Sequence, residues 1–366
     1  MSSVDLAIDS VLPRKRIAVI APGMEILGGQ GVQAAALMNE LANDGFNVTF
    51  IPVNPRFPRT LGWLRKIPYL RTLLNQWLYR LSLRAIKNVD VVHLFSASYW
   101  SFLLAQVPAI DACTRYGKPV ILNYHSGEAD DHLRNWGMWV HPWIERVEKI
   151  VVPSLYLQQV FASYGYKARV IPNIVSLRQF NYRQRKPILP HLLSVRNLES
   201  IYRVGNTLAA YRLIKEKFPG ATLTVAGYGS EEQKLKAYVR ENNIRDVIFV
   251  GRVEPDNIAA LYDQADIFVN SSVVDNQPLS ILEAFAAGLP VISTSVGDIP
   301  QMITHQKTGL LVAADQPDAI AEAVFWILEH QSETAEIAGA ARCSVKKYTW
   351  QCVRTEWTNL FEETTS

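Results

Sequence analysis

Two carboxylates flank a loop that leads into a short predicted helix, and this spacing could bind a phosphorylated sugar. Asp275 lies in the loop, and Glu283 lies inside the helix predicted over 279–287. Pro278 suits the first helical position, because an N–H group there would have no partner within the helix. The free N–H groups of the first turn and the helix dipole favour a phosphate, whereas carboxylates accept hydrogen bonds from sugar or ribose hydroxyl groups. The segment therefore predicts a nucleotide-sugar site. The alternative is an ordinary strand–helix–strand unit with solvated acids.

Two further candidates follow predicted strands in the N-terminal part of the chain. His125 comes directly after the strand predicted over 120–124, and Gly28, Gly29 and Gly31 precede a predicted helix. Glycines let the backbone approach a ligand closely at a helix N-terminus. A structural histidine and a plain strand–helix connection are the alternatives for these two features.

Apolar runs of strand length alternate with helical patterns along the chain, which predicts parallel sheets in α/β domains. The predicted strands cover residues 17–20, 48–53, 89–95, 120–124, 150–152 and 169–171, then 192–195, 222–226, 247–250, 266–270, 291–293 and 310–312. We predict a flexible N-terminus over 1–13, a Rossmann-like domain over 14–175, a proline-punctuated linker over 176–190 and a second Rossmann-like domain over 191–348. The carboxyl ends of the strands would line a ligand cleft between the domains.

Composition favours a globular protein in a reducing compartment. Of the 366 residues, 49% are hydrophobic and 19% are charged, and the net charge of +3 gives no argument for nucleic acid. Cys113, Cys343 and Cys352 are far apart and form no C-x-x-C pair. Asp5 and Asp9 interrupt what would be the apolar region of a secretory signal. We therefore expect a cytoplasmic protein, either soluble or peripheral on the inner face of a membrane.

The stretch 56–87 is basic and contains no acidic residue. Its cations are Arg56, Arg59, Arg65, Lys66, Arg71, Arg80, Arg84 and Lys87. Apolar residues recur at 70, 73, 74, 77, 78 and 81, which is one side of a helix. A helix pressed onto anionic lipid fits this pattern, with each cation near the surface contributing roughly 1 kcal/mol. The alternative is a helix that faces the core and has a solvated basic back.

The segment 270–294, NSSVVDNQPLSILEAFAAGLPVIST, resembles the donor-site signature of the retaining glycosyltransferases of family 4, which have the GT-B fold. In that signature two glutamates seven residues apart precede a helix, a glycine and an apolar strand, so Asp275 departs from the first glutamate. The resemblance spans Arg16 to Trp357, and NYHSGEADDH resembles a bacterial exopolysaccharide or glycolipid branch. It implies two Rossmann-like domains facing a cleft, with the C-terminal helix 349–366 crossing back to complete the first domain.

The resemblance also implies roles for the catalytic candidates. Glu283 would hold the ribose, and Asp275 would bind the hydroxyl groups of the donor sugar. Arg196, which ends the first strand of the second domain, would stabilise the leaving diphosphate. His125 would contact the sugar from the opposite domain.

Other residues would complete the donor site. Leu279 and Ser280 form the helix N-terminus beside the diphosphate, and the glycine loop with Gly28 and Gly29 would face the donor phosphates. Arg252 and Val253 match the loop that recognises the base. In the family a lysine helps to bind the diphosphate, and Arg203 is the cation nearest to its position in this sequence. Arginine and lysine are not interchangeable at such a site. These donor-site roles are what the resemblance implies; the spacing alone does not assign them.

The resemblance therefore implies a retaining glycosyltransferase. It would move a hexosyl unit from a nucleoside-diphosphate sugar, with a UDP-sugar favoured, to a glycan or a polyprenyl-diphosphate-linked acceptor. No metal or cofactor is expected. The acids and histidine of the cluster Glu128, Asp130, Asp131 and His132 have the composition of a metal site, but their spacing fits no closed one. The alternatives are a sugar-nucleotide epimerase on the same fold and a non-catalytic sugar-nucleotide or glycan-binding module.

Overall fold

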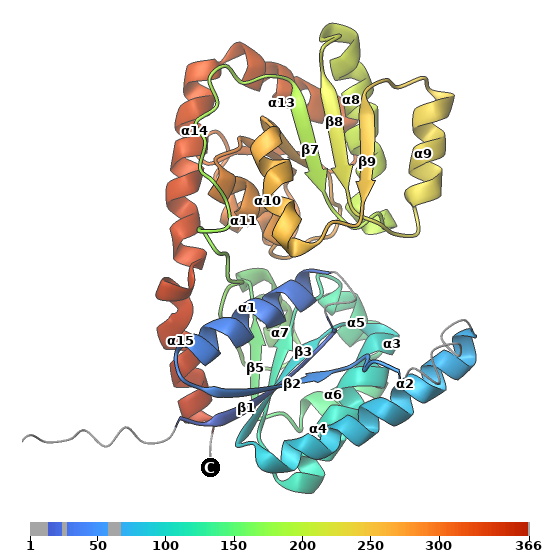
Figure 1. Ribbon diagram of the computed structural model, residues 1–366, viewed down its shortest axis with the longest axis vertical. Helices are drawn as coiled ribbons and strands as arrows, with labels where there is room; N and C mark the ends of the chain where they lie inside the picture. Colours follow the sequence, from blue (N-terminus) through green and yellow to red (C-terminus); the bar gives the residue numbers. More distant parts are fainter. Residues whose placement is uncertain (1–13, 24–27, 58–66, 365–366) are drawn as a thin grey trace, which may run out of the picture.

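The computed structural model describes residues 14–23, 28–57 and 67–364, and it contains two parallel six-stranded sheets, one in each half of the chain (Figure 1). The first sheet has the order β2-β1-β3-β4-β5-β6 and the second the order β12-β11-β10-β7-β8-β9. The strands are β1 (Arg16–Ala21), β2 (Asn47–Pro52), β3 (Val91–Ser96), β4 (Val120–Tyr124), β5 (Lys149–Val152), β6 (Ala168–Val170), β7 (His191–Val195), β8 (Thr222–Ala226), β9 (Val247–Gly251), β10 (Ile267–Asn270), β11 (Val291–Thr294) and β12 (Leu310–Val312). The predicted α/β fold with two parallel sheets is confirmed, and every predicted strand is present.

Helices follow most of the strands. In the first half they are α1 (Gly29–Asn43), α2 (Pro68–Ser82), η2 (Leu83–Asn88), α3 (Tyr99–Ser101), η3 (Phe102–Gln106), α4 (Val107–Tyr116), α5 (Ala129–Asn135), α6 (Gly137–Ile144) and α7 (Leu155–Ser163). In the second half they are η4 (Ser200–Tyr202), α8 (Val204–Lys217), α9 (Glu232–Glu241), α10 (Pro255–Gln264), α11 (Leu279–Ala287), α12 (Ile299–Met302), α13 (Pro317–Glu329), α14 (Gln331–Ser344), η5 (Val345–Tyr348) and α15 (Trp350–Glu363). The predicted segment 1–13 and the cations Arg59, Arg65 and Lys66 lie outside the described residues.

Helices cover both faces of each sheet, which is why the strands are continuous apolar runs. In β1, Ile17 and Val19 face a core shared with α1 and α15, whereas Ala18 and Ile20 face a second core shared with α4. The second sheet packs against α8 and α13 on one face and against α10 and α11 on the other. This layering holds the carboxyl ends of both sets of strands in fixed positions.

The strand order creates a crevice in the second sheet. From β7 the chain continues to β8 and β9 on one side, and it then returns to place β10 on the other side of β7. The loops that follow β7 and β10 therefore leave the sheet in neighbouring positions, at the kind of switch point where open α/β sheets bind ligands. Arg196 follows β7 and Asp275 follows β10, so the topology brings these two predicted residues together.

The C-terminal helices return the chain from the second sheet to the first (Figure 1). Helix α14 and η5 contribute Ala341 and Val345 to a core of the second half. Helix α15 buries its apolar face, including Trp357, against the first sheet. The indole Nε1 of Trp350 donates to Asp44 Oδ2 at 3.1 Å, and the Arg354 guanidinium pairs with the same carboxylate at 2.7 Å. These contacts fix α15 beside the end of α1.

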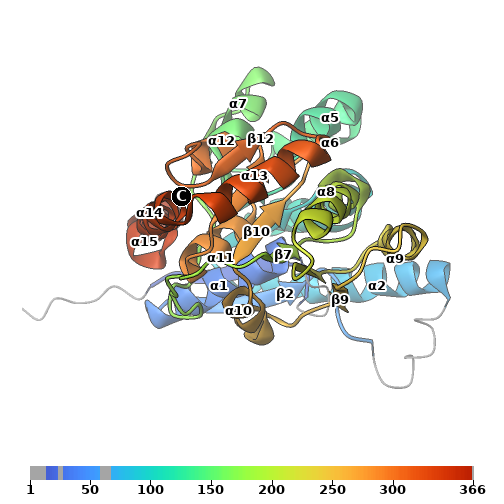
Figure 2. The same cartoon turned by 90° about the horizontal axis from the view of Figure 1, so that it is seen from above.

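Helix α2 exposes part of its apolar stripe. Leu73 and Trp77 are 68% and 57% exposed, and Tyr69 is 85% exposed, whereas Tyr79 on the opposite side is fully buried. The helix lies at the edge of the molecule in both views (Figures 1 and 2). Leu74, Leu78 and Leu81 of the same stripe are half-buried, so the stripe is exposed only in part, and its contact with a membrane stays a prediction. Within the described ranges, no helix is long and apolar enough to cross a membrane.

Candidate donor-sugar site

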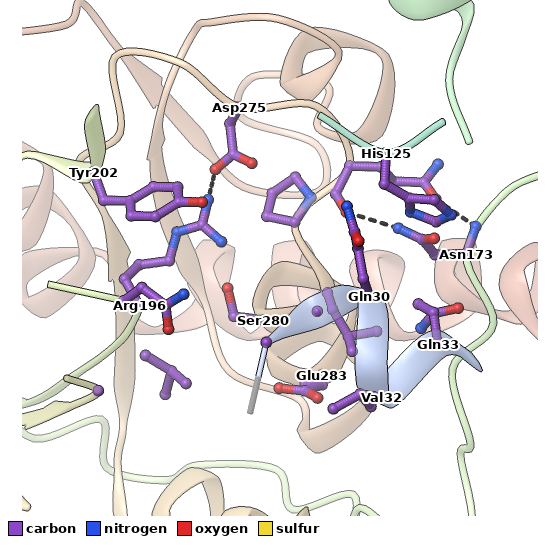
Figure 3. A pocket seen from close by; sticks show the side chains of 18 of the residues that line it. Gln30, Val32, Gln33, His125, Asn173, Arg196, Tyr202, Asp275, Ser280 and Glu283 are labelled. Carbon is purple, nitrogen blue, oxygen red and sulfur yellow. Dashed lines mark hydrogen bonds and ion pairs between the residues drawn. The ribbon is translucent and has the colours of Figure 1, made fainter. Parts of the chain in front are cut away.

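A cleft of about 410 Å³ lies between the two halves of the chain, and residues from both sheets line it. The first half contributes the N-terminus of α1 and the residues that follow β4, while the second half contributes the loops after β7 and β10 and the start of α11. Figure 3 shows Arg196 and Asp275 on one side of the cleft and His125 on the other. All the predicted site residues line this cleft except Arg203.

Arg196 and Asp275 form an ion pair within the cleft. Both side chains are largely buried, with exposed fractions of 12% for Arg196 and 9% for Asp275. The guanidinium also lies over the ring of Tyr202, 4.4 Å from its centroid, and its Nη2 donates to Ser272 Oγ at 3.3 Å. Because a buried guanidinium needs an anionic partner, the Asp275 carboxylate balances the charge of Arg196 within the cleft.

Glu283 lies on α11, lines the cleft and is half-buried (Figure 3). Burial raises the pKa of this carboxyl group to about 7, although a hydrogen bond from Tyr262 opposes the shift. The Tyr262 hydroxyl donates to Glu283 Oε2 at 2.6 Å. Glu283 therefore changes charge near neutral pH, and it accepts hydroxyl donors best when it is ionised.

The N-terminus of α11 opens onto the same cleft. The predicted helix 279–287 is confirmed. Pro278 was expected at the first helical position, but it is the cap residue, with an extended backbone, and Leu279 is the first helical residue. No side chain caps this end, and the Ile281 N–H donates to the Pro278 carbonyl at 3.1 Å, so the N–H groups of Leu279 and Ser280 are the ones open to a ligand or to water. The Ser280 Oγ is buried and has no hydrogen-bond partner among the described residues. A phosphate in the cleft would satisfy these donors.

His125 and the glycine loop form the opposite wall. The His125 ring stacks on Phe95, with 5.2 Å between ring centroids. Burial lowers the pKa of His125 to about 4, so the imidazole is neutral at pH 7. Its Nε2 is buried and finds no partner in the described part of the chain. A Cβ built on Gly28 or Gly29 would meet no described atom within 4 Å, which leaves open space in front of the start of α1.

The two predicted donor-site arginines Arg252 and Arg203 differ in whether they line the cleft. Arg252 lines the cleft with Val253, and its Nε lies 3.2 Å from Glu254 Oε1. Arg203 instead pairs with Asp315 at 3.2 Å and is not a lining residue. The turn η4 places Tyr202 against Arg196 and directs the next residue outward. The structure therefore places Arg203 outside the cleft lining, and its role in gripping the diphosphate stays a prediction.

Several residues outside the predicted set shape the cleft. The backbone N–H of Asn173 donates to Gln277 Oε1 at 2.6 Å, and the Asn173 Nδ2 donates to the Gln277 carbonyl at 3.0 Å. Ser154 donates to Asn276. These bonds hold the loop after Asp275 against the first half. Amide and hydroxyl side chains carry no motif of their own, and the spacing of the sequence offered no signal for them.

The acidic cluster after β4 is only partly solvated. Glu128 lines the cleft and is half-buried, and burial together with the charge of Asp131 raises the pKa of its carboxyl group. His132 is fully buried, with its Nδ1 hydrogen-bonded to the Tyr124 hydroxyl at 2.8 Å. Glu128 therefore lies in the cleft, just after the carboxyl end of β4.

Two family models match the chain and together span residues 27–343. The model described as Glycosyltransferase Family 4 matches residues 27–179, and the model described as Glycosyl transferases group 1 matches residues 179–343. The alpha-monoglucosyldiacylglycerol synthase of Streptococcus pneumoniae is 28% identical over 340 residues, which are 81% of this chain and 75% of the synthase.

Solved structures share the architecture. The sucrose-phosphate synthase of Thermosynechococcus elongatus has a TM-score of 0.81 at 20% identity and covers 96% of this chain and 99% of its own. Anabaena HepE, solved in complex with UDP-glucose, has a TM-score of 0.75 at 14% identity over 96% of this chain and 100% of its own. With the matches to both family models over the two halves, the chain is a glycosyltransferase of the GT-B fold.

Proposed function

We propose that the protein transfers a hexosyl unit from a nucleoside-diphosphate sugar to a glycan or lipid-linked acceptor, with retention of configuration and without a metal. The observation that carries this proposal is the union in one cleft of an uncapped helix N-terminus, a buried cation and two carboxylates. Each group complements one part of a nucleotide sugar: the diphosphate, the ribose or the hexose. A UDP-sugar is favoured, and the UDP-glucose complex of the structurally similar HepE supports this choice.

In the proposed reaction, the acceptor hydroxyl oxygen bonds to the anomeric carbon while the bond from that carbon to the β-phosphate oxygen breaks. The hydroxyl proton passes to the departing phosphate oxygen, so no general acid is needed. Arg196 and the N-terminus of α11 stabilise the charge that develops on the diphosphate. Attack from the face that the diphosphate leaves retains the anomeric configuration.

The ion pair between Arg196 and Asp275 must open when the donor binds. The diphosphate replaces the Asp275 carboxylate at Arg196, and this frees Asp275 to accept hydrogen bonds from hexose hydroxyl groups. The neutral His125, whose Nε2 has no partner among the described residues, faces the cleft from the opposite wall, where it contacts the sugar. Glu283 accepts hydrogen bonds from the hydroxyl groups of the ribose.

The exposed stripe of α2 supports an acceptor held at an anionic membrane surface. Leu73 and Trp77 are exposed on the same helix as the solvent-facing Arg71 and Arg80. An apolar strip with flanking cations suits the boundary between lipid headgroups and acyl chains. The name of the pneumococcal relative, alpha-monoglucosyldiacylglycerol synthase, includes a glycosylated lipid and so agrees with a lipid-linked acceptor.

Product analysis tests the proposal. Thermal-shift measurements with UDP, GDP, ADP and their hexose derivatives first select the donor. The selected donor is then incubated in EDTA with and without polyprenyl-diphosphate-linked sugars and simple glycans. We expect nucleoside diphosphate and a glycosylated acceptor to form together. A changed nucleotide sugar formed without an acceptor would identify an epimerase, and donor binding without turnover would identify a binding module.

A further inference from the structure

A tyrosine outside the cleft lining reaches the carboxylate at the base of the site. Tyr262 lies on α10 and is fully buried. Its hydroxyl is 2.6 Å from Glu283 Oε2 and 3.3 Å from the carbonyl oxygen of Ser280. A single phenol proton makes one short bond, and the shorter contact is the one to Glu283.

Both ends of Tyr262 are held in place. Its ring meets Phe180 edge-on at 5.5 Å between centroids and stacks on Phe268 at 5.9 Å. Its carbonyl oxygen accepts a 2.7 Å hydrogen bond from the buried guanidinium of Arg185. A ring fixed in this way leaves its hydroxyl little freedom, so the Glu283 carboxylate that it contacts is fixed as well.

We propose that Tyr262 is a positioning residue for the donor site, because its hydroxyl holds the Glu283 carboxylate in the orientation that receives the ribose hydroxyl groups. This inference rests on the proposed function. One oxygen of Glu283 accepts the hydrogen bond from Tyr262, and the other would accept a hydrogen bond from the ligand. A carboxylate with one oxygen fixed presents the second oxygen in a defined direction, which reduces the rotamer entropy lost on binding.

The same hydrogen bond affects when Glu283 is charged. Among the described titratable groups, Tyr262 is the one that acts on Glu283, and the charge of Arg196 acts on Tyr262. Burial and the Glu283 charge raise the pKa of the Tyr262 phenol, so it keeps its proton and remains a donor. The bond favours the ionised carboxylate. Without it, Glu283 loses its proton only at a higher pH.

The test measures the affinity for UDP, or for GDP or ADP if one of these binds more tightly, by calorimetry between pH 5.5 and 9. Dividing each affinity by that of Glu283→Gln removes the titration of the nucleotide phosphate itself. For the wild type, this ratio should rise as the pH increases through about 7, where Glu283 ionises. Tyr262→Phe should weaken binding about tenfold at pH 7 and should move the rise to higher pH.

Tyr211→Phe is the matched control. Tyr211 is also fully buried in the second half, and its hydroxyl donates to the Ala221 carbonyl at 2.8 Å, outside the cleft lining. We expect it to lower thermal stability without moving the pH profile. A Tyr262→Phe profile equal to that of Tyr211→Phe would overturn the inference, provided that Glu283→Gln still weakens binding.

Two further results separate this inference from the proposed function. If Glu283→Gln binds the nucleotide as well as the wild type, the ribose role itself fails. Glu283→Asp withdraws the carboxylate from the Tyr262 hydroxyl without disturbing the α10 core, and it should weaken binding as Tyr262→Phe does. Wild-type affinity in Glu283→Asp would contradict positioning by Tyr262 even if Tyr262→Phe did not fold.

Discussion

Arg196 is the residue on which the proposed chemistry depends most. Arg196→Ala removes the side-chain cation beside the expected diphosphate, and we expect transfer to fall by a factor of about 10²–10³. Initial-rate measurements on the folded variant check this loss. Arg203→Ala is the matched control, since that guanidinium pairs with Asp315 outside the cleft lining, and its rate should stay near that of the wild type. A loss of less than about tenfold in Arg196→Ala would contradict the assigned role.

The position of a site residue in the cleft was predictable where the residue belongs to a sequence motif. It was not predictable where residues distant in sequence meet only in the folded structure. Asp275 and Glu283 share one segment, and they meet in the cleft as expected. Arg203 does not line the cleft, because proximity in sequence does not specify direction, and Tyr202 contacts Arg196 instead. Tyr262 reaches Glu283 from a separate helix, so no local pattern could indicate the pair.

At the scale of elements, α2 carries a separate prediction of membrane attachment. Leu73→Ser with Trp77→Ser should reduce flotation with phosphatidylglycerol vesicles, because these exposed side chains would enter the lipid boundary. Arg71→Ser with Arg80→Ser should reduce it at low salt only, since the Debye length falls to roughly 3 Å at 1 M. Nucleotide binding should persist in both variants.

Ile248→Ser provides the matched control for α2. Ile248 is 57% exposed on the edge strand β9 of the other half, and its loss should leave flotation unchanged. Wild-type protein that ignores anionic vesicles at low salt would show that the α2 stripe serves another purpose, and the acceptor would then be soluble.

The elements themselves followed closely from sequence. Helix α11 has its predicted bounds because Gly288 ends it in the left-handed conformation, with φ of 76°, and Pro278 precedes it. Apolar periodicity indicated that α2 is one-sided, but not which side it buries. Burial of a helix face depends on its neighbours, and here the side of α2 with Tyr79 packs inward.

At the scale of the whole molecule, the cleft results from the strand order more than from any single motif. The crossover between β7 and β10 places Arg196 beside Asp275, and the loops of the first sheet close the cleft from the other side. Alternating strands and helices were enough to predict two parallel sheets. The distances across the cleft were not predictable, because they depend on contacts between the halves such as that of Asn173 with Gln277.

The central claim is retaining transfer of a hexosyl unit within this cleft, and the anomeric configuration of the product tests it most directly. Proton NMR of the reaction with an α-linked nucleotide hexose resolves the anomeric coupling constants of donor and product. We expect an α-linked product that forms as the donor signal declines and that is nearly absent with Arg196→Ala. A β-linked product, or a product that forms equally fast with Arg196→Ala, would contradict it.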